Sequence, residues 1–236
     1  MFGYSFRHFD LGKIKFLDSQ EPEENGFTYK GLEPIRPLET PKTVLVTGGA
    51  GFIGSYVAGT LIMLCEIRGA YLHLGSLSSP NPLSPDALLS RGDSVVIIDE
   101  VNDYYDPKLK EGNLELLRNK YGSDKFEFYR GDVCDEELVE KIFNSHSIDF
   151  VCHLAARAGV RPSIEDPLVY VHSNVRGTTT LLTASVKHGV KNFVYASSSS
   201  VYGGSKSVSF TEEEVVDSPV SPYAATKKSC EVRVWG

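Results

Sequence analysis

From Thr43 onward, short β-branched runs alternate with helix-like stretches, and this alternation is the feature that most constrains the fold. Successive β-α units lay their strands side by side in a parallel sheet and their helices on its faces. Most of the runs are hydrophobic almost throughout, as strands buried on both faces must be. The sequence therefore predicts an α/β fold built on a doubly wound parallel sheet. Strands are expected at 43–47, 94–98, 126–129, 149–153 and 192–196, and helices at 135–143 and 170–188.

Three regions depart from this pattern. Residues 1–41 mix basic and acidic side chains and are interpreted as a polar N-terminal arm, followed by one domain over 42–236. The stretch near 62–88 is rich in turn-forming Ser, Pro and Gly, which predicts an insertion between a helix and the next strand. The chain stops soon after the fifth strand and its helix, which predicts one sheet edge without further strands.

Composition excludes several classes of protein. A net charge of −7 and a pI near 5.4 argue against a protein whose main role is to bind nucleic acid or an anionic membrane. The four cysteines are scattered without a Cys-x-x-Cys pair and the histidines form no cluster, so no metal site is predicted. The sequence shows neither a signal peptide nor an apolar stretch of about 20 residues, so no transmembrane segment is expected and the expected location is cytoplasmic.

A glycine-rich segment follows the first strand and opens a helix. Its spacing is G-x-x-G-x-x-G, with Phe52 and Ile53 inside the last interval and glycines at Gly48, Gly51 and Gly54. Glycines allow a tight turn and let backbone N–H groups approach a pyrophosphate at the helix N-terminus. The alternative is a tight strand-to-helix turn with no ligand. The position between strand and helix favours a Rossmann-like dinucleotide site.

Two acidic residues follow later strands. Asp99 ends the second strand, where a carboxylate accepts hydrogen bonds from the adenosine ribose and repels a 2′-phosphate, which favours NAD over NADP. Its alternative role is that of a strand-end turn residue. Asp132, followed by Val133, would either meet the adenine amino group or cap the next helix.

A tyrosine and a lysine are spaced to act together. Tyr223 and Lys227 are four residues apart, so on a helix they share a face. A nearby ammonium stabilises phenolate and lowers a tyrosine pKa from about 10 toward neutrality, which makes the tyrosine a usable base. A serine at the end of the fifth strand would hold a substrate hydroxyl and relay its proton. The same spacing also arises by chance in amphipathic helices, and only its combination with the glycine loop and the serine run supports catalysis.

Over residues 43–231 these motifs, together with His153-Leu154-Ala155-Ala156 and Asn174, resemble the extended short-chain dehydrogenases/reductases that act as NAD-dependent nucleotide-sugar epimerases and dehydratases. The resemblance implies a catalytic triad of Ser198, Tyr223 and Lys227. It also implies that the nicotinamide half of NAD is lined by Leu154, Ala155, Ala156, Asn174, Tyr195 and Lys227.

Segments 102–107, 155–161, 162–167 and 197–203 look most like UDP-glucuronate 4-epimerases within that family. Related 4,6-dehydratases carry Asp-Glu immediately before Val-Tyr-Gly, and decarboxylases keep the Glu. Here Ser199 and Ser200 stand in those positions and are taken as substrate residues, so the simplest outcome is oxidation at C4 and return of the same hydride. Another epimerase or a dehydratase remains an alternative, and an NADP-dependent reductase is disfavoured by Asp99.

Arginines offer a further candidate contact with the substrate. Arg157 and Arg161 would either bind a sugar carboxylate or diphosphate, with Arg161 taken as the substrate residue, or serve as loop or salt-bridge arginines. His153 is expected in the core rather than in catalysis.

The resemblance also carries expectations for the whole chain. Complete family members continue into a smaller C-terminal domain that binds the nucleotide-sugar, and this chain lacks most of it, so a truncated and catalytically silent NAD-binding module is the second hypothesis. Family members dimerise through helices such as those at 111–121 and 170–188, which implies a homodimer.

Overall fold

The computed structural model describes residues 6–10, 41–51, 54, 89, 92–122, 126–205, 210–211 and 214–235, with the backbone alone described for 6–10 and 233–235. The expected insertion near 62–88 lies outside the described residues and stays a prediction, as do the roles of Phe52 and Ile53.

The five expected strands are confirmed, with ends that shift by at most one residue. They are β2 (Thr43–Thr47), β3 (Ser94–Asp99), β4 (Phe126–Arg130), β5 (Phe150–His153) and β6 (Asn192–Ala196). All pair in parallel, in the order β6-β5-β2-β3-β4. The chain therefore winds outward from β2 in one direction and then in the other, which is the doubly wound topology.

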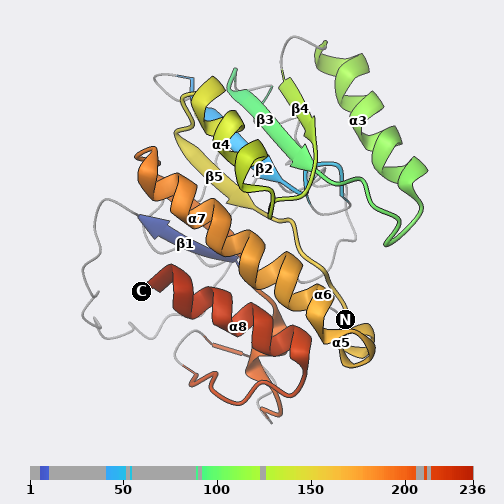
Figure 1. Ribbon diagram of the computed structural model, residues 1–236, viewed down its shortest axis with the longest axis vertical. Coiled ribbons are helices and arrows are strands. Elements are labelled where there is room, and N and C mark those ends of the chain that lie inside the picture. The colour runs from blue at the N-terminus through green and yellow to red at the C-terminus, as the bar shows by residue number, and fades with distance from the viewer. Residues whose placement is uncertain are drawn as a thin grey trace, which may run out of the picture.

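A sixth strand, β1 (Phe6–Asp10), corrects the expected open edge. This part of the N-terminal arm pairs antiparallel with β6, from Phe6 opposite Ala196 to Asp10 opposite Asn192. Figure 1 shows β1 at the margin of the sheet, far from β4. An open β6 edge would leave a row of N–H and C=O groups unpaired, and β1 supplies partners for them.

Helices connect the strands, and the two that were expected are present. The segment at 135–143 forms α4 (Glu136–Ser145), which begins where the Asp135 carboxylate accepts from the N–H groups of Glu137 and Leu138. The segment at 170–188 is helical throughout but changes type, from α6 (Pro167–Tyr170) through a π-helical stretch η1 (Val171–Arg176) to α7 (Gly177–Lys187). The remaining elements are α3 (Pro107–Tyr121), α5 (Val160–Glu165), the 3-10 turn η2 (Ser199–Tyr202) and α8 (Pro222–Trp235).

The core has two halves, one on each face of the sheet. Because side chains alternate along a strand, Val44 and Val46 pack on one face with Leu114 of α3, whereas Leu45 packs on the other with Ile142 of α4 and Leu181 of α7. In Figure 1, α4, α7 and α8 cover this second face. Burial on both faces explains the near-continuous hydrophobicity of the strands.

The parallel arrangement gathers five loops at one edge of the sheet. The loops after β2, β3, β4, β5 and β6 all leave the carboxyl ends of their strands, and they carry most of the candidate site residues that the structure describes. α8 follows the last of these loops and brings its first turns to the same edge. In the described part of the chain, no helix is both long enough and apolar enough to cross a membrane.

Candidate functional site

The glycine loop leaves no room for a side chain at Gly48 or Gly54. Gly48 N–H donates to the Ile98 carbonyl at 2.8 Å, and Gly51 N–H donates to the Gly48 carbonyl at 3.0 Å, which closes a tight turn. Gly48 has φ +69°, and a Cβ there would lie 2.8 Å from the backbone nitrogen of Ala155. A Cβ on Gly54 would overlap the Gly48 carbonyl oxygen. The loop can therefore bring its backbone close to a bound phosphate group.

A cavity of about 260 Å³ opens beside this loop at the carboxyl edge of the sheet. It joins the loop to candidate residues from β3, β4, β5 and α8, as the sequence predicted. The predicted residues that line it are Gly48, Gly51, Gly54, Asp99, Asp132, Val133, Leu154, Ala155, Ala156, Tyr223 and Lys227. The lining residues that the sequence analysis did not assign to the cofactor include Asn102, Tyr104, Lys110 and Arg157.

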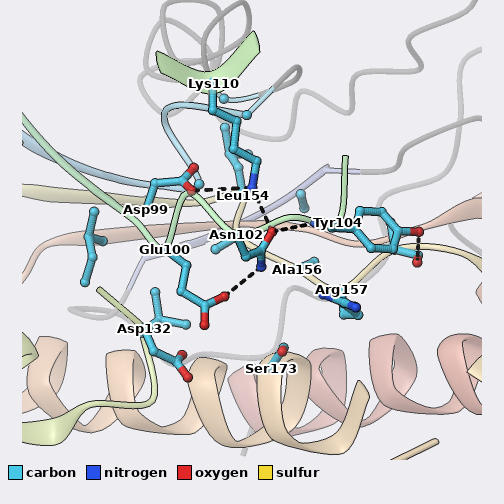
Figure 2. Close-up of a pocket in the computed structure, with 18 of the residues that line it drawn as sticks. Asp99, Glu100, Asn102, Tyr104, Lys110, Asp132, Leu154, Ala156, Arg157 and Ser173 are labelled. Carbon is cyan, nitrogen blue, oxygen red and sulfur yellow. Dashed lines mark hydrogen bonds and ion pairs between the residues drawn. The ribbon is translucent and has the colours of Figure 1, made fainter. Parts of the chain in front are cut away.

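Asp99 has a buried cation beside it. Its carboxylate accepts from Ala50 N–H at 3.2 Å and Val101 N–H at 2.8 Å, and Lys110 Nζ lies 3.8 Å away. Lys110 is only 6% exposed and also donates to Asn102 Oδ1 at 2.8 Å (Figure 2). The predicted repulsion of a 2′-phosphate assumed a lone carboxylate, and Lys110 offsets that charge.

The sequence analysis did not predict Lys110 as a site residue, because no local sequence motif identifies it as one. It lies on α3, which begins where Asp106 Oδ1 accepts from Lys108 N–H and Pro107 occupies the first turn. That helix start is visible in the sequence as Asp106-Pro107. The packing of α3 against the end of β3 is a tertiary feature, and it alone brings Lys110 to Asp99.

Asp132 is hydrogen-bonded on both oxygens. Oδ1 accepts from Cys134 N–H at 2.8 Å and Oδ2 from His172 Nε2 at 2.7 Å. Burial acts to raise the pKa of Asp132, but these hydrogen bonds outweigh it and lower the pKa. The alternative role as a helix cap is wrong, because Asp135 caps α4.

His172 thus has partners that the sequence did not indicate. In the described part of the chain, ligand atoms of Asp132, Cys134 and His172 lie within 4.8 Å of one another. Burial, followed by the charge of Asp132, raises the pKa of the Cys134 thiol to about 12. The thiol donates to the His172 carbonyl at 3.2 Å and is a neutral hydrogen-bond donor rather than a ready metal ligand.

The end of β5 is held by a buried histidine. His153 contacts Thr47 Oγ1 at 2.6 Å and Thr178 Oγ1 at 2.9 Å through its two ring nitrogens. Burial lowers the pKa of His153 to about 3, so the ring is neutral at physiological pH. Thr47 Oγ1 also accepts from Ala155 N–H at 3.1 Å. The expectation that His153 is a core residue is confirmed, and its contacts help to position the loop at Leu154–Ala156.

Tyr223 and Lys227 lie together on α8, and both line the cavity. Lys227 is 3% exposed, donates from Nζ to the Ala196 carbonyl at 2.9 Å and lies 4.9 Å above the Tyr195 ring. Burial lowers the pKa of Lys227 to about 8, against the raising effects of Cys230 and Glu231. Tyr223 is 4% exposed and also lines the cavity. The predicted base and its ammonium partner are therefore both present at the cavity wall.

Asn174 lies behind the cavity wall rather than on it. Its Oδ1 accepts from Arg157 N–H at 2.8 Å, and its Nδ2 donates to the Arg157 carbonyl at 3.1 Å and to Thr226 Oγ1 at 3.0 Å. It is 1% exposed and sits within the π-helical η1. Asn174 thus ties the loop after β5 to α8. Its predicted contact with a cofactor stays a prediction, as does that of Tyr195, which is also buried below the wall.

The serine run forms the turn after β6. Ser198 Oγ accepts from Ser200 N–H at 3.2 Å and lies 3.1 Å from Ser200 Oγ, so it caps η2. Ser197 Oγ donates to the buried Glu231 carboxylate at 2.6 Å, which ties the turn to α8. Among the described residues, Ser198, Ser199 and Ser200 lie beyond Ala196 and do not line the cavity itself. Their catalytic and substrate roles stay predictions.

The two candidate arginines differ in their position relative to the cavity. Arg157 lines the cavity, and its guanidinium lies 4.6 Å from the centre of the Tyr104 ring (Figure 2). Arg161 is exposed on α5 and does not line the cavity. Arg157 is therefore better placed than Arg161 to meet a ligand in this cavity.

A family profile described as GDP-mannose 4,6 dehydratase matches residues 85–234. The chain belongs to this family. The predicted resemblance to the nucleotide-sugar epimerases and dehydratases of the extended short-chain dehydrogenase/reductase class is thereby confirmed. The GDP-mannose 4,6 dehydratase family match spans β3 through α8, the elements that build most of the cavity.

Relatives and solved structures of this family's type agree with the fold. A UDP-glucuronate 4-epimerase from Thermodesulfobacterium geofontis is 42% identical over 188 residues, covering 80% of this chain and 49% of the relative. UDP-glucuronate 4-epimerase 4 from Arabidopsis thaliana is 42% identical over 190 residues, covering 80% of this chain and 36% of the relative. The structure of UDP-glucose 4-epimerase from Bifidobacterium longum, solved with NAD+ and UDP, matches at a TM-score of 0.61 and 30% identity. The match covers 82% of this chain and 48% of that protein. The chain spans half or less of each of these proteins.

Proposed function

We propose that the chain acts as an NAD-dependent nucleotide-sugar 4-epimerase that interconverts UDP-glucuronate and UDP-galacturonate. The observation that carries the proposal is the single cavity shared by the glycine loop, Asp99, Tyr223 and Lys227. A dinucleotide site and a Tyr-Lys pair within one cavity are what hydride transfer to and from a sugar requires. The names of the two UDP-glucuronate 4-epimerase relatives support this choice of sugar.

The cavity suits a dinucleotide. Gly48 and Gly54 form a cradle that a Cβ would fill, so at these two positions the backbone would face a pyrophosphate. Asp99 and Lys110 together offer an acceptor and a donor to the ribose hydroxyls, and Asp132 lies further along the same wall. NAD is the expected form of the cofactor, supported by the relative solved with NAD+. When bound, NAD supplies the hydride acceptor and donor for C4 of the sugar.

In this proposal, Tyr223 is the base and Lys227 its electrostatic partner. The Tyr223 phenolate takes the proton of the C4 hydroxyl while the C4 hydride leaves, which produces a 4-keto sugar. The sugar then presents its other face, the hydride returns to C4 and Tyr223 returns the proton to the oxygen. Lys227, held by the Ala196 carbonyl, stabilises the phenolate in both half-reactions. Ser198 would hold the same hydroxyl from the η2 turn.

The η2 turn favours epimerisation over the dehydration for which the family is named. Removing water from C5 and C6 needs an acid and a base beside the sugar. The two positions of η2 that carry these carboxylates in related dehydratases are Ser199 and Ser200 here, and a hydroxyl near neutral pH is a poor base. Even a 4-keto sugar that carries a C6 hydroxyl is therefore expected to be reduced again rather than dehydrated, and the 4-keto sugar from UDP-glucuronate has no C6 hydroxyl to lose.

The test is product formation by the purified chain. Incubation with NAD and UDP-glucuronate should yield UDP-galacturonate, followed by chromatography. Tyr223→Phe should lower the rate by at least about 100-fold, because it removes the base and leaves the ring. Calorimetric titration with NAD should show binding by both proteins, since the change deletes a single hydroxyl.

Each result separates the two hypotheses. Product that depends on Tyr223 supports the epimerase. NAD binding without product contradicts it and supports the catalytically silent NAD-binding module, because the chain spans about half of its relatives. A 4-keto-6-deoxy product in a parallel incubation with UDP-glucose, which carries the C6 hydroxyl that UDP-glucuronate lacks, would instead indicate a dehydratase.

A further inference from the structure

Two loops that leave different strands meet across the cavity. The first follows β3 and carries Tyr104, and the second follows β5 and carries Arg157 and Ala158. Tyr104 Oη donates to the Ala158 carbonyl at 2.5 Å, and the Arg157 guanidinium lies 4.6 Å from the centre of the Tyr104 ring. Figure 2 shows Tyr104 reaching over to Arg157 beside the other lining residues.

The contacts of Tyr104 with Arg157 and Ala158 form a bridge between the two loops. The sheet topology places this bridge over the path of a dinucleotide. β2, with the glycine loop, lies between β5 and β3, and the chain reverses its winding direction here. Ligands of doubly wound sheets bind across this reversal. Asp99 and Asp132 lie on the β3–β4 side, whereas Tyr223 and Lys227 lie on the β5–β6 side. A dinucleotide that reaches both sides must pass between the two bridged loops.

The bridge can open without leaving a buried polar group unpaired. The Ala158 carbonyl also accepts from Tyr170 Oη at 2.7 Å, and Tyr170 is 2% exposed, so this inner bond remains when Tyr104 moves. Tyr104 is 39% exposed, and its hydroxyl can bind water instead. The cost of opening is therefore one exposed hydrogen bond and one cation–π contact.

Both ends of the bridge are anchored. Gly159 has φ +105°, and a Cβ there would lie 2.9 Å from Tyr104 Oη, so the second loop fits closely under the tyrosine. On the first loop, Tyr104 N–H donates to Asn102 Oδ1 at 3.4 Å, and Lys110 Nζ donates to that same oxygen. The bridge is thus connected through Lys110 to Asp99.

We propose that Tyr104 and Arg157 are positioning residues that form a latch over the cofactor cleft, which opens for the dinucleotide to enter and closes to retain it. The latch rests on the proposed function, because it needs a dinucleotide in the cavity. It predicts that weakening the latch accelerates both association and dissociation of the cofactor. A residue that merely contacts the bound cofactor would alter dissociation alone.

The experiment measures NADH exchange by stopped-flow fluorescence, with dissociation started by excess NAD. Tyr104→Phe removes the hydroxyl and keeps the ring, and it should raise both rate constants about fivefold. Arg157→Gln should raise both about threefold, and Arg157→Lys, which keeps the cation over the ring, should restore most of the wild-type rate. The dissociation constant should change less than either rate constant.

Tyr129→Phe is the matched control. It removes the tyrosine hydroxyl that lies 2.9 Å from His146 Nε2, away from the residues that line the cavity, and should leave both rates unchanged. Equal melting temperatures would exclude a general loss of stability. If wild-type chain binds NADH but Tyr104→Phe exchanges it at the wild-type rate, or changes dissociation alone, the latch is wrong and the proposed function stands. If wild-type chain binds neither NADH nor NAD, both proposals fail.

Discussion

At the scale of single residues, Lys227 lies where the loss of solvation on burial disfavours its charge. Burial lowers the pKa of Lys227 to about 8, so below that pH the folded chain holds a buried cation. Such a shift corresponds to roughly 3 kcal/mol of folding free energy lost at neutral pH, because the unfolded lysine keeps its ordinary pKa. The penalty is present below pH 8 and disappears as the pH rises toward 10.5, where the unfolded lysine also loses its proton.

Replacing this lysine should therefore stabilise the chain while inactivating it. Lys227→Met is expected to raise the free energy of unfolding at pH 7 by about 1–3 kcal/mol without cofactor, since part of the gain is offset by the unpaired Ala196 carbonyl. Urea denaturation measures this. Lys191→Met, on an exposed lysine paired with Asp149, should change stability by less than about 1 kcal/mol. A Lys227→Met protein less stable than wild type would contradict the buried-cation account.

Buried His153 lowers stability in the same direction, toward acid pH, but over a more acidic range. Its folded pKa of about 3 lies below the unfolded value, so the unfolded chain binds a proton first and stability is lost as the pH falls below 6.5. The contribution between pH 7 and pH 5 is about 2 kcal/mol. Denaturant unfolding at the two pH values measures the total change. Imidazole nitrogen shifts should show a neutral His153 at pH 5, and a protonated ring there would refute the assignment.

At the scale of elements, the sheet edge at β6 depends on a short strand from the N-terminal arm. The pairing of β1 with β6 covers five residues on each strand. The arm looked polar and irregular, and five residues of mixed charge carry little strand signal of their own. The strand forms because β6 offers an unpaired edge, which only the folded sheet creates.

Removal of β1 should open that edge. A chain lacking residues 1–10 is expected to exchange amide hydrogens of Asn192–Ala196 faster, by at least about tenfold, because the backbone groups that face β1 lose their partners. It should also self-associate more at high concentration, measured by light scattering. A chain lacking only residues 1–5 keeps β1 and serves as the control. Unchanged exchange in the shorter chain would show that the edge does not rely on β1.

The long helical path from α6 to α7 shows how an element can differ from its sequence pattern. Apolar spacing predicted one regular helix at 170–188, and residues 171–176 are π-helical instead. Asn174 lies within this stretch and hydrogen-bonds the backbone of Arg157 on the loop after β5 and the Thr226 hydroxyl on α8. A widened turn of this kind is common near functional sites. The irregularity thus has a visible role, since it ties two walls of the cavity together.

At the scale of the whole molecule, the winding of the sheet decides where chemistry can occur. The order β6-β5-β2-β3-β4 puts the glycine loop at the centre, with the acidic residues on one side and the Tyr-Lys pair on the other. The cavity is therefore assembled from the ends of all five parallel strands and from α8. The homodimer expected through helices such as 111–121 and 170–188 stays a prediction.

The sequence by itself determined the five parallel strands, the sheet type and half of the residues that line the cavity, because periodicity, glycine spacing and the Tyr-x-x-x-Lys pair are local patterns. Only the tertiary structure decided the rest. Lys110 reaches Asp99 from a separate helix, Tyr104 meets Ala158 from 54 residues away, and β1 joins β6 from the other end of the chain. Contacts between segments distant in sequence depend on how the elements pack, and no local pattern encodes that packing.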